Sequence, residues 1–130
     1  MIYSIFEFGD KLAREVMVPR IDVAAIDAAT PLAEAADMVI KATHSRVPVY
    51  QGTIDNVIGV LYVKDLLRVL HAGNVAVPLL QIVRPAYFVP EAKKVSDLLQ
   101  ELQQRKVHMA IVVDEYGGVA GLVTIEDILE

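Results

Sequence analysis

Residues 108–129 read HMAIVVDEYGGVAGLVTIEDIL, and residues 46–67 read RVPVYQGTIDNVIGVLYVKDLL. The two stretches align without a gap, and their apolar positions match in character along almost the whole length. Self-similarity at a fixed spacing indicates that one structural unit occurs twice in the chain. Four positions carry the same residue in both copies: Val57 and Val119, Gly59 and Gly121, Asp65 and Asp127, and Leu67 and Leu129.

The residues upstream of these stretches repeat as well. Apolar residues spaced i, i+3, i+4, i+7 occur at 32–39 and again at 95–102, which predicts one amphipathic helix in each copy. Each copy is expected to run strand, helix, strand, turn, strand, helix, so the predicted fold class is α+β. The expected elements are 23–26, 31–41, 47–50, 57–61 and 63–70 in the first copy, and 86–89, 94–104, 109–114, 119–123 and 125 onward in the second.

These boundaries predict a first repeat at 14–72, a linker at 73–78 and a second repeat at 79–130. Within the second repeat, residues 114–118 (DEYGG) predict a hairpin turn, because glycine readily adopts the positive φ that such turns require. Residues 124–130 read as a helix that is cut after its first turn. We therefore expect the chain to be a piece of a longer protein.

Composition excludes several classes of protein. The chain has 130 residues, 55% of them hydrophobic, with a mean hydropathy of +0.44 and a net charge of −5. No apolar run approaches the roughly 18–20 residues that a membrane span needs, so we expect no direct membrane insertion. The basic residues are scattered and form no stripe for nucleic acid. The absence of cysteine excludes disulfides, thiolate metal sites and cysteine nucleophiles. The apolar excess is expected to fill a dense core and a partner interface.

The segment Thr124-Ile-Glu-Asp127 places a hydroxyl and a carboxylate three residues apart where a helix is expected to begin. Free N–H groups at a helix start suit a phosphate, and a carboxylate one turn in suits a ribose diol. The same spacing also fits a simple capping box. The first copy has Tyr62 in place of Thr124 but keeps the carboxylate at Asp65. Because the first copy keeps the carboxylate but not the capping threonine, the carboxylate is expected to have a function other than capping. The residues alone therefore favour the ligand-binding and the capping interpretations equally.

Residues 44–48 (HSRVP) are a second candidate feature. A proline at 48, inside a predicted strand, indicates an edge strand or an irregular backbone. An irregular backbone exposes N–H and C=O groups that can read the edge of an adenine. The simpler interpretation, which the residues alone favour, is an ordinary edge strand with Arg46 as a solvated charge.

The sequence offers little support for catalysis or metal binding. His44, His71 and His108 lie far apart and show no metal-ligand spacing. Neither a nucleophile motif nor a phosphate-binding loop motif is present. Carboxylates such as Asp97 and Glu101 fall on the polar faces of predicted helices and are expected to be solvated. We therefore predict that the chain is not an enzyme and has no metal site.

Five motifs carry a resemblance to a known family: residues 14–20 (REVMVPR), 44–50 (HSRVPVY), 61–67 (LYVKDLL), 84–90 (RPAYFVP) and 112–130 (VVDEYGGVAGLVTIEDILE). Together they resemble the tandem CBS domains, or Bateman module, of the CorC/HlyC family of magnesium and cobalt efflux proteins, which is related to the CNNM proteins. The resemblance covers nearly the whole chain, and the DEYGG turn is its most specific part. It implies two β-α-β-β-α repeats arranged as a pseudo-twofold pair.

The resemblance also implies a function. It implies a cytoplasmic regulatory module that binds an adenine nucleotide (AMP, ADP or ATP, with Mg²⁺ accompanying ATP) and does no chemistry. It implies a homodimer in which the CBS pairs form a flat disk, whose rearrangement transmits the nucleotide state to the flanking domains of a parent protein. That parent can place the module at the inner face of the membrane. Residues 1–13 would be the tail of a connecting helix.

Two nucleotide clefts, each combining residues of both copies, follow from the same resemblance. In the first, Asp127 would bind the ribose and Thr124 a phosphate, and the other contacts would come from Val18, Arg20, His44, Ser45, Arg46, Val47 and Pro48. The second would use Tyr62, Asp65, Tyr87, Met109, Ala110 and Ile111. The sequence departs from the family's threonine pattern at Val18, Tyr62 and Lys64. These departures leave an alternative open, a structural dimerisation module with degenerate, empty clefts.

Overall fold

The computed structural model describes residues 11–74 and 76–129 and divides into two compact units. The middle unit comprises Ala24–Ala86, and the terminal unit comprises the residues up to Val23 together with those from Tyr87 onward. Most of the connecting-helix tail expected at residues 1–13 lies outside the described residues. Within the described ranges, no helix combines the length and the apolar character that crossing a membrane would require.

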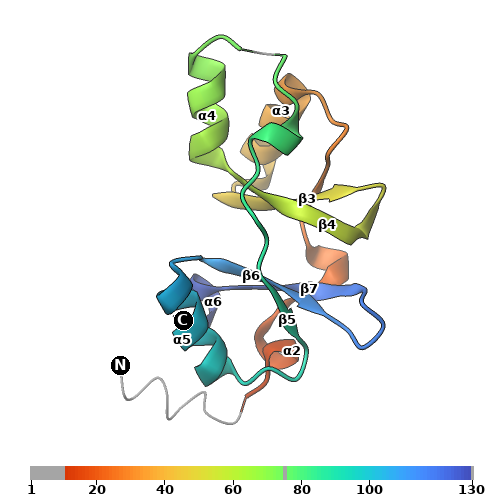
Figure 1. Ribbon diagram of the computed structural model, residues 1–130, viewed down its shortest axis with the longest axis vertical. Helices are drawn as coiled ribbons and strands as arrows, with labels where there is room; N and C mark the ends of the chain where they lie inside the picture. The colour runs from red at the N-terminus through yellow and green to blue at the C-terminus, as the bar shows by residue number, and fades with distance from the viewer. Residues whose placement is uncertain (1–10, 75, 130) are drawn as a thin grey trace. The chain divides into compact units, whose positions relative to one another are not determined.

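The middle unit is a three-stranded sheet packed against helices (Figure 1). Strand β3 lies in the centre, parallel to β2 and antiparallel to β4. Its core joins apolar strand residues such as Val49 and Leu61 to helix residues such as Leu66. The elements are β2 (Ile26–Asp27), α3 (Leu32–Ala42), β3 (Arg46–Gln51), β4 (Thr53–Tyr62), α4 (Val63–His71) and the 3₁₀ helix η2 (Leu79–Gln81).

The terminal unit is a four-stranded sheet in the order β1-β7-β6-β5. Strand β6 is parallel to β5 and antiparallel to β7, so it repeats the pairing that β3 makes in the middle unit. Ala110, Val112 and Val123 pack with α5 and α6 in its core. The elements are α2 (Ala13–Val16), β1 (Val18–Pro19), the 3₁₀ helix η1 (Arg20–Asp22), β5 (Phe88–Pro90), α5 (Val95–Arg105), β6 (Met109–Val113), β7 (Val119–Thr124) and α6 (Ile125–Leu129).

The first long helix of each repeat follows the apolar spacing that predicts it. In α5 the buried residues Val95, Leu98 and Leu102 form one stripe, as the corresponding residues do in α3. Both helices end at a residue with a left-handed backbone, Thr43 at φ 55° and Lys106 at φ 56°. The two copies, which the sequence matches by the character of their side chains, therefore also share the backbone conformation at the end of this helix.

The hairpin predicted at DEYGG forms between β6 and β7. The Asp114 carboxylate accepts hydrogen bonds from the N–H groups of Tyr116 (2.9 Å) and Gly118 (2.8 Å), and Gly117 takes a positive φ of 84°. The side chain of Asp114 thus holds the turn in the way that aspartate commonly does. The predicted turn is confirmed, and the strands on either side of it meet in the expected antiparallel pairing.

Two strands are shorter than the sequence predicts. Strand β2 contains only Ile26 and Asp27, although a strand was expected from residue 23, because its parallel partners on β3 are only Val49 and Tyr50. Strand β5 begins at Phe88 and not at residue 86. Apolar character alone does not define a strand end, since the ladder continues only where a partner strand is in register.

A short segment near the start of each sequence repeat pairs with the last strand of the unit in which it lies. In the terminal unit, Val18 lies opposite Leu122 in the β1–β7 pair. In the middle unit, Arg84 forms an antiparallel bridge with Val60 of β4, with N···O distances of 2.8 and 2.9 Å. Residues 18–19, which lie in the first sequence repeat, therefore belong to the sheet of the second. The compact units and the sequence repeats differ by these exchanged segments.

Glycine is required where the segment crosses β7. A Cβ built on Gly121 would lie 2.2 Å from the carbonyl oxygen of Val18, which is far inside van der Waals contact. Gly121→Ala is expected to lower the free energy of unfolding by about 1–3 kcal/mol, the usual cost of overpacking. Urea unfolding measures the change, with Gln103→Ala on the exposed face of α5 as the control. Equal unfolding midpoints for the two variants would contradict this account of the β1–β7 contact.

Candidate functional site

The end of the terminal unit's repeat presents a hydroxyl and a carboxylate at the start of α6. The Thr124 Oγ1 accepts a hydrogen bond from the N–H of Asp127 at 3.2 Å. The N–H of Ile125 donates to the carbonyl of His108 at 2.9 Å, which ties the helix start to the beginning of β6. The capping interpretation of Thr124 is therefore confirmed, but it accounts only for the hydroxyl and the backbone of Asp127.

The carboxylate of Asp127, unlike the Thr124 hydroxyl, has no hydrogen-bond partner among the described residues. The Asp127 residue is exposed, and no described residue makes a hydrogen bond or an ion pair with its carboxylate. Among the described residues, therefore, none competes for either carboxylate oxygen as a hydrogen-bond acceptor. The Asp127 carboxylate is therefore suited to accept two hydrogen bonds, such as those from the two hydroxyls of a vicinal diol.

Strand β1 brings two further predicted residues to β7 in the same unit. Val18 is half-buried in the β1–β7 pair. Arg20, in η1, lies at the surface, and its Nη1 donates to the carbonyl of Val119 at 3.1 Å. The sheet register therefore collects Val18 and Arg20 on the strand that ends in Thr124, although more than a hundred residues separate Arg20 from Thr124 in sequence.

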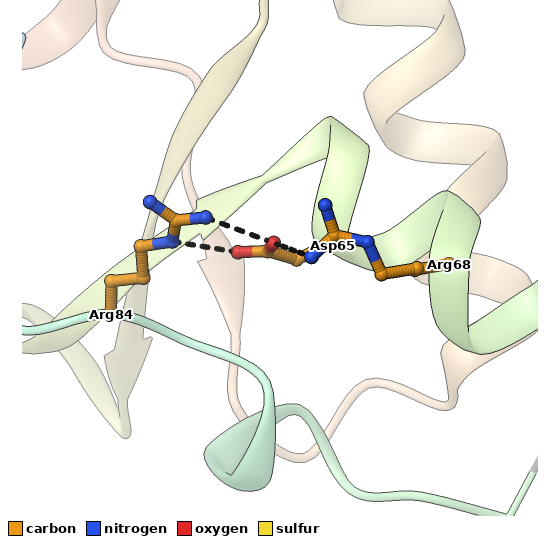
Figure 2. A network of polar contacts seen from close by, with 3 residues as sticks. All are labelled: Asp65, Arg68 and Arg84. Carbon is orange, nitrogen blue, oxygen red and sulfur yellow. Dashed lines mark hydrogen bonds and ion pairs between the residues drawn. The ribbon is translucent and has the colours of Figure 1, made fainter.

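The equivalent position of the middle unit is occupied by the chain itself (Figure 2). The Arg84 guanidinium donates to both carboxylate oxygens of Asp65, from Nε to Oδ2 at 2.8 Å and from Nη2 to Oδ1 at 3.0 Å. Arg68, one helical turn along α4, adds a contact of 3.5 Å to Oδ1. The Arg84 Cζ also lies 4.2 Å from the ring centroid of Tyr62, a cation–π distance.

This contact changes the protonation behaviour of Asp65. The hydrogen bond from Arg84 is the largest cause that lowers the pKa of Asp65 below its ordinary value of 3.8, with the charges of Arg84, Arg68 and Lys64 acting in the same direction. A lowered pKa means that the folded state favours the ionised carboxylate. The part of the Asp65 side chain left exposed is 14%. The carboxylate predicted to line the second cleft is therefore engaged in an intrachain ion pair.

The residues 44–48 belong to the middle unit and differ in exposure. His44 and Ser45 are exposed ahead of β3, and Arg46 is half-buried with its Cζ 5.4 Å from the Tyr62 ring centroid. Arg46 is therefore not a simple solvated charge. Val47 and Pro48 are buried on β3, and Val47 belongs to the unit's core. The side chain of Val47 is therefore part of the core, and its backbone pairs with Leu61 of β4.

The expectation of an edge strand at Pro48 is wrong. Strand β3 is the central strand of its sheet, paired with β4 along its length and with β2 from Val49 onward. The proline is tolerated because Val60, which lies opposite it on β4, directs its own N–H and C=O to Arg84, so the missing N–H of Pro48 leaves no gap in the β3–β4 ladder. On its other side β2 pairs with β3 only from Val49 onward. The predicted irregularity is present, as register shifts against β4 at Val49–Gln51, just after the proline.

The remaining predicted residues lie on β5 and β6 or beside them in the terminal unit. Met109, Ala110 and Ile111 are buried, and Ala110 points into the core cluster. Tyr87 is half-buried, and its carbonyl accepts a hydrogen bond from the N–H of Ile111 at 2.7 Å. In this stretch, therefore, only Tyr87 keeps a polar side chain with partial access to solvent.

The expectation that Glu101 is solvated is wrong. Its carboxylate accepts a hydrogen bond from the Tyr87 hydroxyl and pairs with Lys93, and the Arg105 guanidinium lies 4.4 Å from the Tyr87 ring centroid. The hydrogen bond from Lys93 is the main cause that lowers the pKa of Glu101, and the bond to Glu101 raises the pKa of Tyr87. Tyr87 is thus held by its own unit, and its hydroxyl already has an acceptor.

Arg84 is the functional candidate that the sequence analysis did not identify. One signal was present, because aligning Pro85 with Pro19 places Arg84 on Val18. Nothing in the sequence, however, linked Arg84 to Asp65, nineteen residues away. The structure brings together Val18, Arg20, Thr124 and Asp127 in the terminal unit. It joins Tyr62, Asp65 and Arg84 in the middle unit.

Comparison with known proteins identifies the family of the chain. The CBS domain family model matches residues 13–72 and 80–130. The magnesium and cobalt efflux protein CorC of Pasteurella multocida is 43% identical over 130 residues, which cover 100% of this chain and 43% of that protein. The chain spans less than half the length of the curated relatives compared, from 20% to 45%.

Solved structures give the same result at the level of the fold. The CBS domain of a bacterial CNNM/CorC family Mg²⁺ transporter in complex with ATP is 45% identical, with a TM-score of 0.92, and the match covers 99% of this chain and 92% of that one. A CBS-domain pair with bound AMP from Klebsiella pneumoniae is 32% identical, with a TM-score of 0.81 and coverage of 91% and 94%. The predicted α+β fold of two repeats is confirmed. The chain belongs to the CBS domain family, as a CBS-domain pair of the CNNM/CorC type.

Proposed function

We propose that this chain is the adenine-nucleotide-binding regulatory module of a magnesium and cobalt efflux protein. The observation that carries the proposal is the exposed carboxylate of Asp127, which no described residue engages, at the start of α6. Support comes from a relative at 45% identity that is described in complex with ATP and from another at 32% identity described with bound AMP. The name of the CorC relative supports the transport assignment of the parent protein.

Each polar residue of the terminal unit's site has a proposed role. Asp127 accepts the two ribose hydroxyls of the nucleotide, since its carboxylate offers acceptor positions on both oxygens. Thr124 accepts the N–H of Asp127 and so holds the start of α6, while its own O–H remains a donor for a phosphate oxygen. Arg20 supplies a permanent positive charge beside β7, which suits a phosphate. The roles assigned to residues 44–48 stay predictions.

The charge of the chain bears on which nucleotide form binds. The net charge is −5, so a triphosphate meets more repulsion than a monophosphate does. We propose that ATP binds with Mg²⁺, which neutralises part of the phosphate charge, and that AMP binds without it. Binding regulates the parent protein through rearrangement of a homodimer of the module at the cytoplasmic face of the membrane. A ligand shifts such an equilibrium only through a difference in affinity between the two arrangements.

A second candidate function is a structural dimerisation module without a ligand. The observation that favours it is the ion pair of Asp65 with Arg84, which closes the middle unit's equivalent position. The apolar side chain of Val18 beside β7 is a second point in its favour, since it offers no polar contact. The two functions differ in a single measurable property, the binding of a nucleotide to the folded dimer.

Calorimetric titration with AMP and with ATP, each with and without Mg²⁺, separates the two functions. Saturable binding of AMP in both conditions, and of ATP more tightly with Mg²⁺, is the expected result. Denaturing the freshly purified protein and measuring adenine absorbance in the filtrate controls for nucleotide that co-purifies and blocks the titration. No binding of either nucleotide to a nucleotide-free, folded dimer would reject the proposal in favour of the structural module.

A further inference from the structure

Both oxygens of the Asp65 carboxylate are engaged by side chains of its own unit. Arg84 donates to both oxygens, and Arg68 contacts one of them. A bidentate arginine–carboxylate pair is among the strongest polar contacts in proteins, and it uses the oxygens that a ribose diol would need. A nucleotide can bind at Asp65 only if Arg84 first leaves the carboxylate.

Arg84 is held at this position by its backbone and by its side chain. Its N–H and C=O groups both pair with Val60, and this close approach depends on Gly59, where an added Cβ would lie 2.8 Å from the Arg84 carbonyl oxygen. Its guanidinium lies against the Tyr62 ring at 4.2 Å as well as against Asp65. The arginine is thus preorganised between a ring and a carboxylate, and releasing it forfeits both contacts.

The terminal unit has the same backbone arrangement with different side chains. Val18 pairs with Leu122 of β7 as Arg84 pairs with Val60 of β4, and Gly121 permits the same close approach. The carboxylate there is that of Asp127, which no described residue engages. Valine has no donor, so the terminal unit lacks a side chain at this position that can close the carboxylate.

We propose that the residue at this single position, Arg84 in one unit and Val18 in the other, decides which repeat of the pair accepts a nucleotide. Arg84 acts as an internal lock that occupies Asp65 in place of a ligand. Val18 leaves Asp127 open, so the chain binds one nucleotide, in the repeat that contains Asp127. The inference rests on the proposed nucleotide-binding function and assigns to Arg84 the choice of site.

Exchange of the two residues tests the lock. Val18→Arg is expected to place a guanidinium on Asp127 and to weaken AMP binding by at least tenfold. Val18→Met adds similar length without a donor and is expected to lose several-fold less affinity than Val18→Arg, which separates the ion pair from simple obstruction. Unchanged AMP affinity in Val18→Arg, or equal losses in the two variants, would overturn the proposal.

The reverse change opens the locked position. Arg84→Val, combined with Asp127→Ala to remove the terminal unit's site, is expected to bind AMP where Asp127→Ala alone does so weakly. The opened position keeps cationic side chains for a phosphate, because Arg46 and Lys64 lie 5.4 and 6.0 Å from the Tyr62 ring centroid. If the double variant binds AMP no better than Asp127→Ala, Arg84 does not control access and the proposal fails. Arg68→Ala, which leaves the bidentate pair intact, is the matched control and is expected to retain one site.

A readout without nucleotide distinguishes failure of the lock from failure of the proposed function. Carbon-13 NMR of the Asp65 carboxyl is expected to show a pKa that rises on Arg84→Val and stays low in Arg68→Ala. An unchanged pKa on Arg84→Val would show that the ion pair does not form in solution and would overturn the lock. Wild-type protein that binds no nucleotide while the Asp65 pKa responds as expected would reject the proposed function and, with it, the choice of site. The ion pair would then stand as a structural contact only.

Discussion

Asp127→Ala is expected to weaken the binding of AMP and of Mg²⁺–ATP by about a hundredfold or more, because it removes the acceptor of two ribose hydroxyls. Hydrogen bonds to a charged group contribute about 1.5–3 kcal/mol each, and about 1.4 kcal/mol corresponds to a factor of ten in affinity. The Asp127 carboxylate has no described protein partner to lose. Its removal should therefore cost affinity and leave the unfolding midpoint nearly unchanged. Calorimetric titration of both nucleotides measures the first effect, and urea unfolding measures the second.

The control for this variant must remove the same charge elsewhere. Asp97→Ala does so, because Asp97 is exposed on α5 of the same unit. Loss of one negative charge by itself favours binding of an anionic nucleotide, so the control is expected to bind as well as the wild type or slightly better. Asp127→Asn adds a further comparison, since it keeps the shape and one acceptor oxygen. Wild-type affinity in Asp127→Ala would remove Asp127 from the site.

Ile128→Ala is expected to lower the free energy of unfolding by about 2–5 kcal/mol, the range for deleting buried aliphatic side chains. Ile128 is 0% exposed and is the only buried residue among those described in α6. It therefore anchors the short helix that carries Asp127. Because the anchored helix positions the carboxylate, AMP affinity is expected to fall as well, even under conditions where the protein remains folded. Urea unfolding and calorimetry on the same sample measure the two effects.

Two comparison variants separate anchoring from general loss of stability. Leu129→Ala changes the neighbouring residue, which is 42% exposed, and is expected to alter stability by no more than about 0.5 kcal/mol, as surface substitutions usually do. Leu66→Ala removes the equivalent buried residue of α4 in the middle unit. It is expected to destabilise the protein by a similar amount but to leave the affinity of the folded protein unchanged. Equal affinity losses in Leu66→Ala and Ile128→Ala would show that stability alone controls binding.

The helices and the hairpin could be predicted because each is encoded by local spacing. The apolar stripe of 95–102 has the period of a helix, and the observed α5 covers Val95–Arg105 where 94–104 was expected. The turn at Asp114 depends on a side chain that bonds to backbone groups two and four residues away. Strand ends were less predictable, as β2 shows, because a strand extends only as far as its partner permits.

The residues of the candidate site likewise fall into those that local spacing predicts and those that it does not. Thr124 and Asp127 could be found from sequence, because a cap and the residue three positions later are neighbours in any helix start. Glu101 was misjudged, since its position on a polar helix face gave no sign of the Tyr87 hydroxyl and the Lys93 amine that meet it. Contacts of this kind depend on which strand or loop packs beside the helix.

The sequence by itself determined that the chain is duplicated, that each copy has an α+β order of elements, and that each copy ends in an aspartate one turn into a helix. These properties follow from residue spacing, which the backbone of a helix or a hairpin translates directly into geometry. Only the tertiary structure decided that the two aspartates are unequal. Arg84 and Val18 reach the last strand of their units through backbone pairing between distant segments. An ion pair depends on the distance between two charged groups in space. For Asp65 and Arg84 that distance is set by the pairing of Arg84 with Val60, and the number of residues between them in the sequence does not encode it.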